Sequence, residues 1–153
     1  MSAAKPFKLE QEPLWKEAFE IAEYMYGTLP GFPHGEEWGV AAKMRSASAD
    51  CLLWVSFALG NPGTTSREYE WASARKHACA LKAMYLLATR QQFVVLEPAV
   101  VVRLDKLIFQ IDAERLDAIE QDEKQAAMER QKELKSWLEK YEIWKKLKEE
   151  RDS

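Results

Sequence analysis

Apolar residues recur at steps of three and four through most of the chain, a spacing that places them on one face of an α-helix. Helix-breaking residues are confined to a few places. All six glycines lie between Gly27 and Gly63, and after Gly63 only Pro98 interrupts the pattern. Because proline removes a backbone donor and glycine raises the entropic cost of helix formation, this distribution predicts a small number of long helices.

The apolar positions predict four core helices, at about 13–28, 36–59, 66–92 and from 97 onward. Their inward stripes comprise Trp15, Ala18, Phe19, Ala22, Met25, Tyr26 and Leu29 in the first helix; Ala41, Met44, Ser48, Cys51, Leu52, Val55 and Leu59 in the second; and Val101, Leu104, Leu107, Ile108, Ile111, Arg115, Ala118 and Ile119 in the fourth. The third helix is rich in small residues, which leave room for close neighbours. We therefore expect an all-α fold, an up-down-up-down four-helix bundle with a C-terminal helical extension.

Local signals refine the ends of the third helix. Thr65 and Glu68 have the spacing of a capping box, so the helix is expected to start near Ser66. After it, the segment 93–96 is rich in β-branched residues, as a short strand would be. No second strand-like segment is present to pair with it, so we expect a connector.

The C-terminal part of the sequence differs from the rest. Residues 120–133 hold almost no large apolar group, which is typical of a solvated helix or a linker. A second amphipathic segment follows, and its stripe consists of Leu134, Trp137, Leu138, Tyr141, Trp144 and Leu147. The expected organisation is an N-terminal arm (1–12), a four-helix bundle (13–121) and a charged amphipathic tail (122–153). The tail stripe packs on its own bundle or a neighbouring subunit, or else it docks in a partner's groove with Trp137, Tyr141 and Trp144 as anchors.

Three aromatic residues of the second predicted helix lie off its inward face. They are Trp38, Trp54 and Phe57. A monomer rarely leaves such aromatic area in water. We therefore predict that these residues form the interface of a homo-oligomer.

Composition and charge narrow the choice of partner. The chain has 153 residues, of which 47% are hydrophobic, enough for one domain core. Its 22 Lys and Arg against 25 Asp and Glu give a net charge of −3, so any basic site must be local. The third helix carries such a set, Arg75, Lys76, Lys82 and Arg90, which is predicted to bind nucleic acid when repeated around an oligomer. The alternative is that these cations pair with Asp and Glu within or between subunits.

The sequence carries none of several common catalytic, cofactor-binding or metal-binding motifs. It lacks the nucleophile elbow, the P-loop, the dinucleotide glycine fingerprint and the His-Glu-x-x-His motif, so we expect no enzyme activity and no cofactor. Two histidines and two cysteines cannot build a Cys-rich zinc module or a disulfide framework, and no metal site is expected. If the second and third helices fold back on each other, Cys51 lies level with Ala74 rather than Cys79, which favours reduced thiols. With no apolar run near the roughly 20 residues that span a bilayer, we expect a cytoplasmic protein that binds no membrane.

The segment 14–119 resembles a bacterial four-helix-bundle family. This family includes the protein encoded in intervening sequences of 23S ribosomal RNA genes and the accessory variability determinant of diversity-generating retroelements. The motifs that carry the resemblance are Trp15-x-x-Ala18-x-x-x-Ala22-x-x-x-Tyr26, Phe32-Pro33-x-x-Glu36-Glu37-Trp38-Gly39, Met44-Arg45-x-Ala47 and Glu68-Tyr69. The intervening-sequence proteins usually end their second helix with Asn-Ile-Ala-Glu-Gly. Here the bulkier Trp54-Val-Ser-Phe57 stands in that region, which favours the accessory-protein branch.

This resemblance implies a homopentamer. It also implies a non-catalytic accessory subunit that binds a reverse transcriptase and its template RNA in a diversity-generating retroelement. The alternative function is a structural oligomer whose C-terminal helix recruits another protein without nucleic acid.

Overall fold

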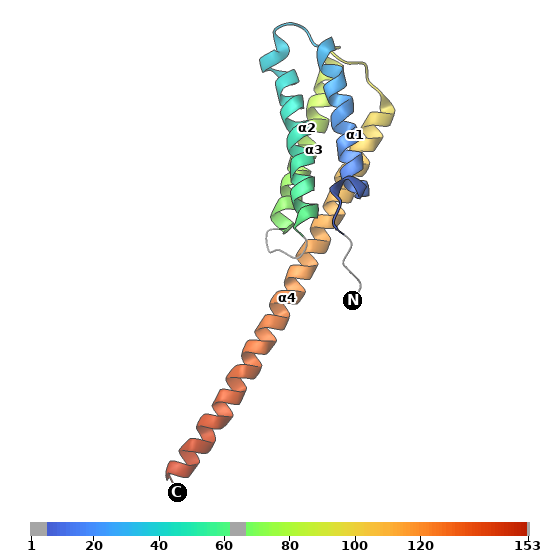
Figure 1. Cartoon of the computed structure of the whole chain (residues 1–153). Coiled ribbons are helices and arrows are strands. Elements are labelled where there is room, and N and C mark those ends of the chain that lie inside the picture. Colours follow the sequence, from blue (N-terminus) through green and yellow to red (C-terminus); the bar gives the residue numbers. More distant parts are fainter. Residues whose placement is uncertain (1–5, 62–66, 153) are drawn as a thin grey trace. The chain divides into compact units, whose positions relative to one another are not determined.

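The protein is all-helical. The computed structural model describes residues 6–61 and 67–152, and these contain helices, turns and connectors but no strand. The α-helices are α1 (Pro13–Thr28), α2 (Val40–Gly60), α3 (Arg67–Arg90) and α4 (Pro98–Asp152), with the 3₁₀ turns η1 (Leu9–Gln11), η2 (Leu29–Gly31) and η3 (Glu36–Trp38) (Figure 1). The expected all-α fold is confirmed. Thr65, one half of the predicted capping box, lies outside the described residues.

The chain divides into two compact units. The first ends at Asp117 and the second begins at Ala118, whereas the sequence pattern placed the boundary after residue 121. The first unit contains α1, α2, α3 and the N-terminal part of α4. The second consists of the remainder of α4. Residues 120–133, expected as either a solvated helix or a linker, are helical, and the helix continues to Asp152.

The core of the first unit draws large side chains from all four helices. Those less than 2% exposed include Ile21 and Met25 of α1, Met44 and Val55 of α2, Trp71, Leu81 and Tyr85 of α3, and Leu104, Leu107 and Ile111 of α4. Alanines fill the closest approaches: Ala74, Ala78 and Ala88 on α3 are fully buried. Three small residues of the third helix therefore line the core, whereas Ala80 and Ala83 are exposed.

The inward faces differ from the sequence pattern at several positions. Phe19 and Tyr26, predicted on the inward face of α1, are 38% and 45% exposed, while Ile21 is buried in their place. On α2, alanines such as Ala47 and Ala58 are buried, whereas Leu52 and Leu59 are only partly covered. Where α2 packs closely against α3, the middle of the contact has room only for small side chains such as alanine. Larger side chains therefore lie at the edges of the contact.

Side-chain pairs give the directions of neighbouring helices. Arg75 of α3 pairs with Asp112 of α4, and Lys82, one heptad later on α3, pairs with Asp105, one heptad earlier on α4. These two helices are therefore antiparallel within the first unit. The α2–α3 pair is also antiparallel, because Asp50 contacts His77 while the later residue Trp54 contacts the earlier residue Tyr69.

The segment 91–97 connects α3 to α4 and forms no strand, as expected for residues 93–96. The Tyr85 hydroxyl fixes the C-terminal end of this connector, because it accepts a hydrogen bond of 3.0 Å from the Glu97 backbone N–H. The same hydroxyl lies 3.4 Å from that of Tyr24 on α1. Burial, followed by this hydrogen bond, raises the pKa of Tyr24. Tyr24 and Tyr85 thus tie α1, α3 and the connector together.

Candidate interaction surfaces

Three aromatic side chains meet on the outer side of α2 and α3. The ring centroids of Trp54 and Phe57 are 5.5 Å apart, and those of Trp54 and Tyr69 are 5.7 Å apart, both in edge-on arrangements. Phe57 is 42% exposed and Tyr69 is 62% exposed, with Leu53 of α2 also 46% exposed. We call Trp54, Phe57 and Tyr69 the α2–α3 aromatic cluster.

The structure separates the third predicted interface residue from this cluster. Trp38 lies in η3, before α2 begins, and is 90% exposed. Val40, the first residue of α2, already lies about 21 Å along the helix axis from Trp54 at 1.5 Å per residue, and Trp38 precedes it. Sequence reasoning missed Tyr69, although folding the second and third helices back on each other already places it close to Trp54.

Two of the four predicted nucleic-acid-binding cations are held by carboxylates of α4. Arg75 Nε lies 3.0 Å from an Asp112 oxygen, and Lys82 pairs with Asp105. These contacts fit the alternative prediction of pairing with acidic residues, because a cation already paired gains less from a phosphate.

The other two cations of the set remain available. Lys76 and Arg90 are exposed on α3, and within the described residues neither forms an ion pair. They are fourteen residues apart, which is about 21 Å along the helix axis at 1.5 Å per residue. Of the predicted set, one subunit therefore offers two separated charges rather than a continuous stripe.

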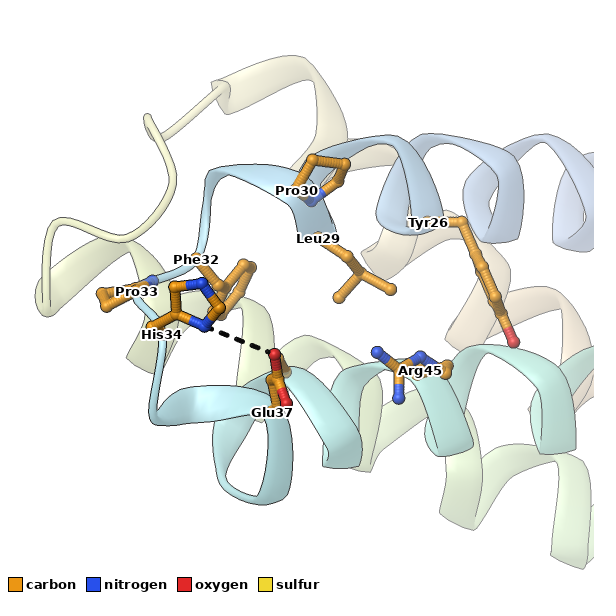
Figure 2. Close-up of a pocket in the computed structure, with 9 residues that line it drawn as sticks. Tyr26, Leu29, Pro30, Phe32, Pro33, His34, Glu37 and Arg45 are labelled. Atoms are coloured by element: carbon orange, nitrogen blue, oxygen red, sulfur yellow. Dashed lines mark ion pairs between the residues drawn. The ribbon is translucent and has the colours of Figure 1, made fainter.

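A pocket of about 430 Å³ lies where η2 and the following turn join α1 to α2 (Figure 2). Tyr26 comes from α1, Arg45 from α2, and the turn contributes His34 and, in η3, Glu37. The His34 Nδ1 to Glu37 Oε1 distance is 3.6 Å, and both side chains are exposed. All four of these titratable groups face solvent, so the pocket offers no desolvated acid or base of the kind that catalysis uses.

The tail stripe is the most exposed aromatic surface of the second unit. The Trp137 and Tyr141 rings stack with centroids 5.4 Å apart, and the Tyr141 and Trp144 rings follow at 6.1 Å. Lys148 Nζ lies 5.3 Å from the Trp144 ring centroid, a cation–π contact. Exposure of the six stripe residues ranges from 45% for Tyr141 to 59% for Trp137. The stripe is therefore ordered along one helix face yet open to solvent.

The chain matches no family model and no curated protein. Among the described residues, no group of three or more His, Cys, Asp or Glu side chains is arranged to hold a metal ion. None of the described helices combines the length and the apolar character that crossing a bilayer requires.

Proposed function

We propose that the protein is a non-catalytic scaffold subunit, which self-associates through the α2–α3 aromatic cluster and uses its tail stripe for a second helical association. The observation that carries this proposal is the exposure of ordered aromatic side chains on two helical surfaces, the cluster and the stripe. Apolar surface of this kind is normally covered in the working form of a protein.

In this proposal the first unit is an up-down-up-down four-helix bundle, and residues 122–153 form its C-terminal helical extension. The antiparallel pairings of α2 with α3 and of α3 with α4 support that topology. Trp38, Trp54 and Phe57 contribute to the subunit interface. A ring of five subunits follows from the family resemblance of the segment 14–119.

Sedimentation equilibrium tests the self-association. The wild-type protein should be an oligomer at micromolar concentration, and a single 17.7 kDa species would contradict the proposal. The double variant Leu53→Glu/Phe57→Glu should lower the mass, because it places charged side chains in the proposed interface. Both side chains are about half exposed, so their replacement leaves the core intact. Val102→Glu, at a comparably exposed site on α4, is the matched control and should leave the mass unchanged. Circular dichroism should show equal helicity in all three proteins.

A second candidate function adds nucleic acid. Here the scaffold is the accessory subunit of a retroelement reverse transcriptase in the cytoplasm and binds its template RNA. The exposed Lys76 and Arg90, unpaired in the described part of the chain, favour this version. Repetition around an oligomer would multiply their contribution, because each neutralised phosphate adds to affinity.

RNA binding at low salt decides between these versions. The wild-type oligomer should bind RNA at about 50 mM salt and lose affinity steeply as salt rises. Lys76→Glu/Arg90→Glu should abolish binding, while Lys43→Glu on the exposed face of α2 serves as a control for lost charge. Absence of wild-type binding at about 50 mM salt would leave the protein-only scaffold.

A further inference from the structure

The tail helix carries a repeat that is longer than its aromatic stripe. Alternating steps of three and four residues pass through Glu120, Glu123, Ala127, Arg130, Leu134, Trp137, Tyr141, Trp144, Lys148 and Arg151. This average step of about 3.5 residues is the seam of a coiled coil. All of these positions are helical and exposed in the second unit. The seam is acidic at its N-terminal end and basic at its C-terminal end, and between these ends it is apolar or aromatic at every position except Arg130.

We propose that two copies of the chain associate through their tail helices, paired antiparallel as a two-stranded coiled coil. This inference rests on the proposed function and names the second copy as the occupant of the tail stripe. An acidic-to-basic seam is complementary to itself only when the two copies run in opposite directions, because each end then meets charges of opposite sign. The charge order of the seam thus selects both the partner and its direction.

The middle of this pairing matches side chains by size and chemistry. With Leu134 of each copy opposite Trp137 of the other, Trp144 falls opposite Ala127, so a large side chain meets a small one. In the same register Tyr141 falls opposite Arg130, whose guanidinium can lie on the ring face. Each of these contacts occurs twice because the pair is symmetric.

The ends of the pairing are closed by ion pairs. Lys148 of one copy faces Glu123 of the other, and Arg151 faces Glu120. The Glu120 carboxylate also binds Lys124 of its own chain at 2.7 Å, and this contact keeps Lys124 from presenting an uncompensated charge to the partner. That compensation matters because Lys124 lies near Lys145 of the second copy in this register.

The flanking positions agree with the same register. Glu133 of one copy faces Lys140 of the other on one side of the seam, and Ala126 faces Leu147. Leu147 lies away from the centre of the stripe and is 59% exposed. The contact with Ala126 would cover this apolar side chain. A parallel pair would instead place Glu123 against Glu123 and Lys148 against Lys148, with Lys140 near Lys145. Like charges at both ends therefore favour the antiparallel over the parallel arrangement.

Charge reversal in the full-length protein tests the register. Glu123→Lys and Lys148→Glu should each weaken the tail pairing about tenfold or more, since each converts two ion pairs per dimer into repulsions. The double variant Glu123→Lys/Lys148→Glu should regain wild-type association, and so should an equimolar mixture of the two single variants. Sedimentation equilibrium of each protein measures the association. Lys146→Glu, on the opposite face of the same helix, is the matched control and should have no effect.

The outcomes separate the inference from the proposed function. If Leu53→Glu/Phe57→Glu lowers the mass and Trp137→Glu/Trp144→Glu also does, but the single charge reversals do not, the antiparallel register is wrong while the scaffold function stands. Failure of the double charge variant to regain association would also overturn the register. A 17.7 kDa wild-type species would overturn both the inference and the proposed function.

Discussion

Arg103 clamps the N-terminal part of α4 to α1, and replacing it should destabilise the first unit. Its Nε and one terminal nitrogen donate to both Glu17 oxygens, at 2.7 and 3.0 Å. The same terminal nitrogen donates to Glu20 at 2.6 Å. Arg103→Met removes these charge-assisted hydrogen bonds while it keeps an apolar stem of similar length.

The expected loss follows from the exposure of the clamp. Buried hydrogen bonds to charged groups contribute about 1.5–3 kcal/mol, and fully exposed ion pairs about 0.2–1 kcal/mol. The side chains of Arg103 and Glu17 are 37% and 30% exposed, which places the clamp between these cases. We therefore expect Arg103→Met to lower the free energy of unfolding by about 1–2 kcal/mol at pH 7.

The same clamp predicts a pH dependence. The hydrogen bond from Arg103 holds the pKa of Glu17 below its ordinary value of 4.5. A lowered folded-state pKa stabilises the fold above about pH 4.5, and this contribution is lost as pH falls through the folded-state pKa. The stability difference between wild type and variant should thus be full at pH 7 and should shrink once the carboxyl is protonated.

Urea denaturation of wild type, Arg103→Met and the exposed control Lys43→Met, at pH 7 and about pH 3, measures both effects. The control should stay within about 0.5 kcal/mol of wild type. An Arg103→Met protein as stable as wild type at pH 7 would refute the clamp. A difference that persists undiminished at the acidic pH would refute the role of Glu17 ionisation.

Two further predictions concern the core and the cysteines. Leu104→Ala, at a fully buried site, should cost about 2–5 kcal/mol in urea denaturation, whereas Phe109→Ala, 75% exposed on the same helix, should cost less than about 0.5 kcal/mol; equal losses would contradict the assigned core. Cys79 is exposed, while burial raises the pKa of the Cys51 thiol to about 12, so a thiol reagent near pH 8 should modify one cysteine quickly and the second only upon unfolding. Equally fast modification of both would show that Cys51 is accessible.

The sequence predicts the helices well where breakers mark their ends. α1 was expected at Pro13–Thr28 and has those bounds, because Pro13 suits the first helical turn and the Pro30 turn follows. α2 was expected from Glu36, but Glu36–Trp38 forms the 3₁₀ turn η3 and the α-helix begins at Val40. A 3₁₀ turn and the start of an α-helix have nearly the same apolar spacing over three residues, so periodicity does not separate them.

The sequence predicts helix faces less well than helix ends. Apolar periodicity assigns a large hydrophobic residue such as Phe19 to the inward face. Where two helices pack closely, however, small residues such as Ala47 are the ones buried. Arg75 and Lys82 pair with carboxylates of α4. Predicting these pairs requires knowing how α3 and α4 are aligned, and counting the charges on one helix does not give that alignment. Composition therefore indicated a basic helix, while the assembled unit leaves two of its four candidate cations available.

The two proposed associations reinforce each other. An oligomer formed through the α2–α3 aromatic cluster carries one tail per subunit. Once one pair of tails joins two oligomers, their remaining tails are held close together, so a second pair forms at a high effective concentration. Individual tail pairs can then be weak while the joined assembly is stable. Variants of the tail seam should consequently act more strongly on the assembly than on a single pair of tails. Variants of the cluster such as Phe57→Glu should weaken tail pairing without altering any tail residue.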